Sequence, residues 1–118
     1  MRLRLIIRKV RMMVNITNKN IFMTKGDTVK LSIVIKDKNN AQYTMQSGDH
    51  IIITVRKPHS LKDEFSITSE DNNIVIDKDM TSNMKPGVYE YDVQLTFENG
   101  EVNTIVPLHK FVIQKEVS

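Results

Sequence analysis

Hydrophobic and polar residues alternate along most of the chain from Ile16 onward. In residues 29–36, Val, Leu and Ile occupy every second position, and Lys and Ser fill most of the positions between them. Residues 89–97 repeat this pattern, with acidic residues, Gln and Thr between the apolar ones. A period of two is typical of a strand that buries one face and exposes the other. The pattern therefore predicts half-buried β-strands.

Turn-forming residues separate these alternating runs. Gly26, Gly48, the Pro86-Gly87 pair and the Asn99-Gly100 pair each border an apolar run, and Asn-Gly is the pair that tight hairpin turns favour. One helical turn is expected near residues 81–84. The expected strands cover residues 16–23, 29–36, 43–45, 51–56, 65–67, 74–76, 89–97, 102–106 and 111–113, with 65–67 and 74–76 paired as a hairpin.

Seven to nine short strands, with turns about every 8–12 residues, predict an all-β fold: an antiparallel immunoglobulin-like β-sandwich. The stretch before Tyr89 supports this architecture. A polar loop meets Gly87, and the hydroxyl of Tyr89 could then donate a hydrogen bond back to that loop, as in a tyrosine corner. The alternative is that Tyr89 and Tyr91 are ordinary core residues. Because the chain has no Cys and no Trp, any likeness to antibody domains is one of architecture.

Composition agrees with a β fold and excludes several classes of protein. Ile occurs 14 times, Val 12 and Thr 9, whereas Ala occurs once; β-branched residues suit strands and Ala suits helices. The absence of Cys excludes disulfide scaffolds, cysteine-type zinc fingers and thiol nucleophiles. No apolar run approaches the roughly 20 residues that a membrane-spanning helix needs. A length of 118 residues fits a single domain.

The net charge of +3 comes from the first thirteen residues, which hold five Lys or Arg and no acid. We divide the chain into this basic amino-terminal segment, 1–13, and a single β-sandwich domain, 14–118. Three interpretations of the segment stay open: an extension upstream of a start at Met12 or Met13, an extra edge strand, or a binding arm for nucleic acid or membrane. A signal peptide is not expected, because Arg8, Lys9 and Arg11 interrupt the apolar run.

Candidate catalytic and metal-binding residues are few and scattered. The three His (His50, His59 and His109) lie in different segments. The Asp49-His50 pair could be half of a metal or acid–base site, but a solvated turn His explains it better. Both Asp77-Lys78-Asp79 and the run at 37–40 lack the Gly and the distal Glu of a calcium loop.

Three serines (Ser60, Ser66 and Ser69) lie in no nucleophile elbow. A carboxylate pair for glycoside hydrolysis can come from distant parts of a chain, but 6% aromatic residues without Trp make a poor sugar platform. We therefore predict no enzymatic activity, no catalytic residues, no cofactor and no metal site.

Nucleic-acid binding through the sheet is not expected either. Such a sheet needs aromatic residues interleaved with Lys or Arg on one face. Tyr89, Tyr91 and Phe97 share a face with Val93 and Leu95, which predicts a core. The opposite face of the same strand carries acidic and neutral residues, which phosphate groups would avoid.

Several segments together resemble a known family. They are GDTVKL at residues 26–31, GDHIIITVRK at 48–57, KPGVYEYDVQL at 85–95, Gly100 with Thr104-Ile105, and FVIQKEV at 111–117. The chain is similar here to small tail or baseplate proteins of phages and prophages of low-GC Gram-positive bacteria, and most to the amino-terminal domain of the baseplate upper protein family. The resemblance spans about residues 20–117. Family members usually continue into a helical or receptor-connecting part, which these 118 residues do not contain.

The resemblance implies a non-enzymatic structural protein of a phage tail or baseplate, found in the virion or, during assembly, in the host cytoplasm. Its expected partners are other tail or baseplate proteins or copies of itself, and neither a membrane nor nucleic acid. The expected docking elements are the open strand edges at 102–106 and 16–23, with Ile52 and Val34 as exposed apolar residues; ordinary surface scatter explains these two equally well. The alternative function is a surface carbohydrate-binding or adhesion module.

Overall fold

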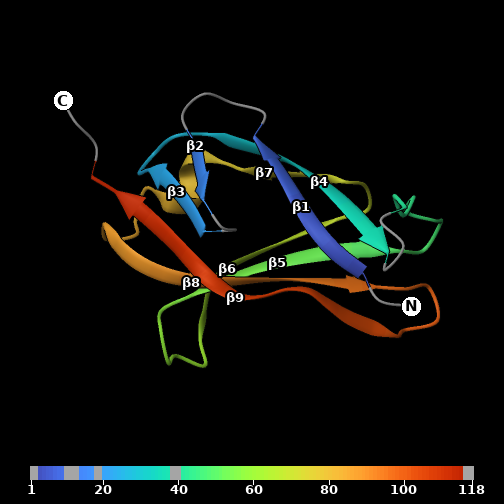
Figure 1. Ribbon diagram of the computed structural model, residues 1–118. Coiled ribbons are helices and arrows are strands. Elements are labelled where there is room, and N and C mark those ends of the chain that lie inside the picture. The colour runs from blue at the N-terminus through green and yellow to red at the C-terminus, as the bar shows by residue number, and fades with distance from the viewer. Residues whose placement is uncertain (1–2, 10–13, 18–19, 38–40, 116–118) are drawn as a thin grey trace.

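The computed structural model describes residues 3–9, 14–17, 20–37 and 41–115. They form nine strands and one short helix (Figure 1). The elements are β1 (Leu3–Lys9), β2 (Val14–Thr17), β3 (Asn20–Thr24), β4 (Val29–Asp37), β5 (His50–Arg56), β6 (Asp63–Ser69), β7 (Asn73–Ile76), α1 (Lys78–Thr81), β8 (Gly87–Thr96) and β9 (Val102–Gln114). The prediction of an all-β fold with seven to nine strands is confirmed.

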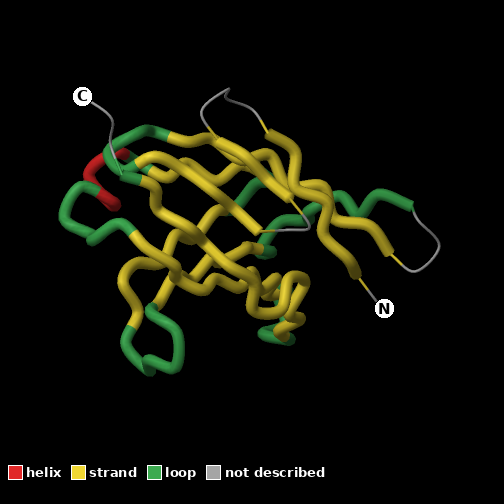
Figure 2. The backbone as a smooth tube through the Cα atoms, turned by 60° about the vertical axis from the view of Figure 1, so that its left-hand side comes forward, coloured by secondary structure: helices red, strands yellow, loops and turns green. Residues whose placement is uncertain are grey.

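The strands form two sheets. The smaller has the order β1-β4-β7, and the larger has the order β2-β3-β9-β8-β5-β6. Every pairing is antiparallel except that of β3 with β9, which is parallel and places Phe22 beside Val112. The larger sheet is therefore mixed, whereas the sequence pattern predicted antiparallel pairing throughout. Figure 2 shows α1 at one end of the layered strands.

One hydrophobic core lies between the two sheets. Alternation within β5 and β8 buries one face of each strand and leaves the other half-buried. The predicted core face of β8 is confirmed, because Tyr89, Tyr91, Val93 and Leu95 are buried and Phe97 packs against them. The smaller sheet contributes its own alternating residues to the same core: Val29, Leu31, Ile33, Ile35, Ile74 and Ile76.

The predicted hairpin between residues 65–67 and 74–76 is wrong. Both segments are strands, but β6 pairs with β5 in the larger sheet and β7 pairs with β4 in the smaller one. The turn between β6 and β7 explains why the chain passes from the larger sheet to the smaller one. Ser69 and Asp71 bond to each other and to nearby backbone, and Asn72 donates its side-chain amide to the carbonyl of Ile33 on β4. The turn is thus fastened to the smaller sheet.

Two other expected elements differ from the structure. Residues 43–45 form no strand, because the Tyr43 side chain and the backbone of Gln46 both bond to Asp49 and curl the chain. The helical turn lies at Lys78–Thr81, earlier than expected, because Asp77 caps it by accepting from the backbone of Asp79.

Residues 3–9 form β1, which is an edge strand of the smaller sheet and pairs with β4. This is the edge-strand alternative among the three interpretations of the basic segment. The rest of that segment, 1–2 and 10–13, lies outside the described residues.

The last strand is continuous from Val102 to Gln114, where the sequence predicted two strands separated by Pro107. Its register with β8 shifts twice. Tyr91 pairs with His109, but Val93 pairs with Val106 and Gln94 with Thr104. Pro107 lies in the first irregularity, so it bulges the strand and does not end it.

Candidate functional site

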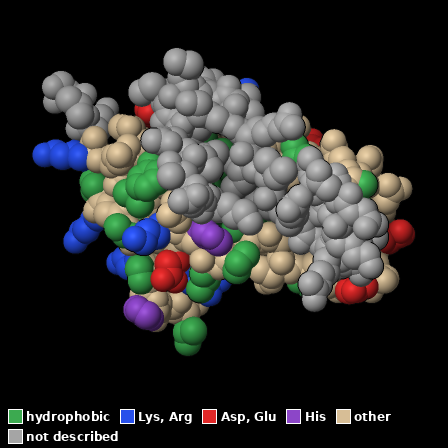
Figure 3. All heavy atoms as spheres, viewed as in Figure 1, with side chains coloured by type: hydrophobic (Ala, Val, Ile, Leu, Met, Phe, Trp, Pro, Cys, Tyr) green, Lys and Arg blue, Asp and Glu red, His purple; other side chains and the backbone are tan. Residues whose placement is uncertain are grey.

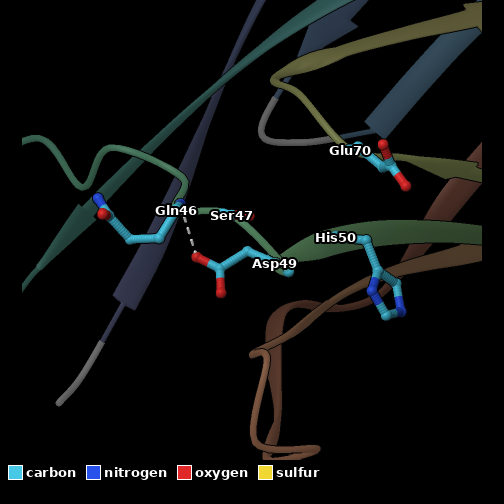
Figure 4. A pocket seen from close by; sticks show the side chains of 6 residues that line it. Gln46, Ser47, Asp49, His50 and Glu70 are labelled. Atoms are coloured by element: carbon cyan, nitrogen blue, oxygen red, sulfur yellow. Dashed lines mark hydrogen bonds between the residues drawn. The ribbon is translucent and has the colours of Figure 1, made fainter.

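The Asp49-His50 pair lies where the loop after β4 enters β5, beside a cavity of about 300 Å³. Gln46, Gly48 and Glu70 also line this cavity. Figure 4 shows the carboxylate of Asp49 turned toward Gln46, while the ring of His50 points elsewhere and Glu70 lies apart. The three titratable side chains therefore do not converge on one point.

Asp49 is a buried carboxylate with 4% of its surface exposed. Its Oδ2 accepts a hydrogen bond from the Tyr43 hydroxyl at 2.5 Å and another from the Gln46 backbone N–H at 2.9 Å. Burial opposes ionisation of Asp49, but these bonds and one from the Glu98 backbone outweigh it and hold its pKa below the usual value. For Tyr43, burial and the bond to Asp49 raise the hydroxyl pKa to about 12.

The same loop is packed against the β8–β9 turn. The rings of Tyr43 and Phe97 meet edge to face with centroids 5.9 Å apart. Gly48 has φ +91°, and a Cβ built there would lie 2.6 Å from Cγ of Glu98. We call residues 43–49 with Phe97 and Glu98 the Asp49 corner. The Asp49 carboxylate accepts its hydrogen bonds from other residues of this corner. These contacts indicate that the corner stabilises the fold.

The other candidate residues are dispersed. The Asp77 side chain caps α1. His59 lies in the loop after β5 with φ 62°. The ring of His109 packs against Tyr91 and lies 2.6 Å from the carbonyl of Pro107. In the run at 37–40, residues 38–40 fall outside the described residues. Across the described ranges, no group of three or more His, Cys, Asp or Glu side chains could hold a metal ion.

The predicted contact of Tyr89 is confirmed. Its hydroxyl donates to the carbonyl of Lys85 at 2.7 Å, which ties the start of β8 to the preceding loop. Burial, followed by the charge of Glu64, raises the Tyr89 pKa despite this bond. Tyr91, the second tyrosine of the motif, is fully buried and packs edge to face on Phe111.

The strand edges are the other candidate surface. β3 pairs with β9 only over residues 111–114 of β9, so residues 102–110 have β8 as their one partner among the described strands. Within this segment Pro107 has no N–H, and the Lys110 N–H is taken by the Asn20 side chain at 3.0 Å. The part of this edge without such protection is residues 102–106, one of the two segments expected from the sequence.

The second expected edge, residues 16–23, is partly wrong. This segment contains two strands, β2 and β3, and residues 18–19 between them lie outside the described residues. β3 is an interior strand because β9 covers its other side. Only β2 is at the edge of the larger sheet, and the parallel β3–β9 pairing, which alternation cannot reveal, is the reason.

The expected exposure of Ile52 and Val34 is also wrong, since both are half-buried. Ile52 lies between Thr68 of β6 and Gln94 of β8, whose neighbouring side chains shelter it. Among the larger-sheet side chains whose burial is described, Val88, Val102 and Leu108 of β8 and β9 are apolar and more than half exposed. On the face seen in Figure 3, hydrophobic, acidic and basic side chains are interspersed over the described part.

Sequence reasoning missed the edge formed by β6. This strand has β5 as its one described neighbour in the larger sheet. The signal was present in its composition, because residues 65–69 contain no Lys, no Pro and no Gly, the residues that commonly protect an edge. It was overlooked because 65–67 was assigned to a hairpin with 74–76, which would have covered it.

No protein-family model matches the sequence, and the search of curated proteins finds no match. Among the described residues, no helix has the length and apolar character needed to cross a membrane.

Proposed function

We propose that this chain is a non-enzymatic structural protein of a phage or prophage tail or baseplate, and that it works by docking its strand edges and loops to neighbouring proteins. The observation that carries the proposal is the edge of β9 at residues 102–106, where no described strand pairs on the side away from β8. The exposed Val102 lies at its start, and Thr104 is exposed beside it. An extended segment of a neighbouring protein could pair with this edge and continue the larger sheet.

An immunoglobulin-like sandwich is the architecture we propose for this scaffold. Support comes from the sheet orders, from the parallel pairing of β3 with the last strand, and from the Tyr89–Lys85 hydrogen bond at the start of β8. Such a scaffold holds both its loop ends and its strand edges on a rigid core, which suits a component that assembles by surface contact.

The alternative, a carbohydrate-binding or adhesion module, has less support. Its most suitable aromatic residues near a cavity are Tyr43 and Phe97, and these pack on each other. The Tyr43 hydroxyl is already bonded to Asp49. A sugar would have to disrupt the Asp49 corner to use these groups.

Mass spectrometry of particles purified after prophage induction in the source strain tests the proposed role. We expect peptides of this chain in intact particles at tens of copies per tail, a copy number typical of symmetric assemblies. The same spectra identify the natural amino terminus. Absence from intact particles would contradict the tail role, and glycan-array binding by the purified chain would then favour the adhesion module.

A variant pair tests the role of the β9 edge. Thr104→Lys puts a positive charge on the uncovered part of β9, and we expect it to reduce incorporation into particles. Gln114→Lys is the matched control, because Gln114 is exposed on the same strand where β3 already pairs with it. Equal incorporation of both variants and of the wild type would exclude this edge as the docking element.

A further inference from the structure

β6 is an edge strand of the larger sheet, and its residues 65–69 carry few of the features that usually protect an edge. Natural edge strands are commonly protected by Lys, Pro, bulges or a covering segment. The open part of β9 ends at Pro107 and at the Asn20–Lys110 contact. In contrast, the central residues of β6, 65–69, are Phe, Ser, Ile, Thr and Ser. Such an edge favours pairing with another strand.

The side chains of β6 suit an added strand on both faces. Phe65 and Ile67 point inward and are half-buried against the core, where Phe65 meets the ring of Phe111 at 6.0 Å. Ser66 and Thr68 lie on the other face and are exposed. A strand beside β6 with the same alternation would complete the burial of Phe65 and Ile67 and place small polar residues against Ser66 and Thr68.

The charges around β6 are arranged in two sets. Asp63 and Glu64 are paired within the chain, to Arg56 at 3.6 Å and to Lys57 at 4.0 Å respectively. Lys62 and Glu70 flank the strand at opposite ends, are exposed, and have no ion pair among the described residues. The two ends of the strand therefore carry opposite charges that the chain itself leaves unused.

We propose that β6 pairs antiparallel with β6 of a second copy of this chain, about a two-fold axis at Ser66. In this register Phe65 lies opposite Ile67, and the Lys62 end of each β6 lies next to the Glu70 end of the other. Residues opposite each other must point to the same face, so the neighbouring allowed registers centre on Phe65 or Ile67. The Ile67 register sets Glu64 against Glu70, which the like charges disfavour. The Phe65 register moves the Lys62 end away from Glu70.

At the β-bulge between Val55 and Arg56, Glu64 of β6 has no opposite residue on β5, so the register and the alternation of faces shift by one residue before Phe65. Lys62 therefore does not lie directly opposite Glu70, and its long side chain has to bridge this offset to form the ion pair. The pairing would join two copies of the larger sheet into one continuous sheet with an isologous interface. The inference depends on this edge and its charges, and it is independent of any role in a phage tail.

Sedimentation equilibrium of the full chain tests the inference. We expect the wild type to dimerise, and we expect Ser66→Lys to weaken the dimer about tenfold, because two lysines then face each other at the axis. Gln114→Lys, the same kind of change at an exposed residue of β9 where β3 already pairs, serves as the control and should dimerise like the wild type. A wild type that stays monomeric at near-millimolar concentration would overturn the proposal, as would an undiminished Ser66→Lys dimer.

A charge swap tests the register without depending on the fold of an edge variant. Lys62→Glu and Glu70→Lys should each weaken the dimer several-fold, and the double variant should restore it, because the pairs reform with reversed sign. Circular dichroism confirms that each variant is folded. A double variant no tighter than the two single variants would show that Lys62 and Glu70 do not meet.

Discussion

The Asp49 corner and the β6 edge both lie at the surface, but they differ in whether their polar groups have partners within the chain. In the corner, a buried carboxylate is satisfied by a tyrosine hydroxyl and by backbone N–H groups. Along β6, one side of the strand has no described partner, and the flanking charges of Lys62 and Glu70 are unpaired. Groups bonded within the chain stabilise the fold, whereas unpaired groups at a strand edge are available to a partner. Changes in the corner should affect unfolding, and changes at the edge should affect assembly.

The largest effect is expected from Asp49→Ala. The substitution leaves the Tyr43 hydroxyl and the Gln46 N–H without their acceptor in a part-buried corner, and it should lower the free energy of unfolding by about 2–3 kcal/mol. Asp71→Ala is the control, because Asp71 is exposed and bonds only within its own turn. Urea unfolding measures both, and equal losses would contradict the special role of the corner.

Gly48→Ala should have the next largest effect. At φ +91° any side chain strains the backbone, and a Cβ would also lie too close to Glu98. We expect a loss of about 2 kcal/mol, against about 1 kcal/mol for Gly26→Ala. Gly26 has a similar φ of +85° but open space around the added Cβ. Identical thermal midpoints for the two variants would show that the contact with Glu98 is unimportant.

Tyr89→Phe should lower the free energy of unfolding by about 1–2 kcal/mol, since the Lys85 carbonyl loses its donor while the ring stays packed. The hydrogen bond is 2.7 Å long and part-buried. An unchanged urea midpoint would mean that water replaces the hydroxyl at no cost.

Acid should weaken the Asp49 corner. Because the folded pKa of Asp49 lies below its usual 3.8, its stabilisation is complete above that pH and is lost as pH falls through the lower folded value. The difference in thermal midpoint between the wild type and Asp49→Asn should therefore narrow below pH 3.8. A constant difference from neutral to acid pH would contradict this assignment.

The smallest effect on stability is expected at the edge. Ser66→Lys should change the free energy of monomer unfolding by no more than about 0.5 kcal/mol, because Ser66 is exposed and makes no described side-chain bond. Chemical unfolding at low protein concentration measures this. A large loss in the free energy of unfolding would mean that Ser66 contributes to the stability of the monomer.

Strand positions and core faces could be predicted from the sequence because they depend on local alternation. The core side of β5 and β8 and the Tyr89 contact follow from period two and from a short loop. Sheet membership could not be predicted in the same way. Nothing local distinguishes β7 as a partner of β6 from β7 as a partner of β4, and the decisive contact of Asn72 with Ile33 joins residues far apart in the chain.

The Asp49 corner was only half visible in the sequence. The Asp49-His50 pair drew attention to possible chemistry, but alternation assigned Tyr43 to a strand. Tyr43 turns out to be the hydrogen-bond donor that Asp49 requires when it is buried. A Tyr six residues before a buried Asp fits neither a strand nor a helix period. The contact between them therefore becomes visible only in the three-dimensional structure.

The parallel ladder of β3 with β9 brings Ile21 beside Phe111 and, next to it, Asn20 to within a hydrogen bond of Lys110, 90 residues away. Contacts of such large sequence separation slow folding, because the chain loses the entropy of loop closure before these stabilising contacts form. During synthesis, β3 has no described partner on this side until residues 111–114 of β9 have left the ribosome. The larger sheet is therefore completed last at the β3–β9 pairing. Register errors, or pairing of β3 with another chain, would begin most easily there.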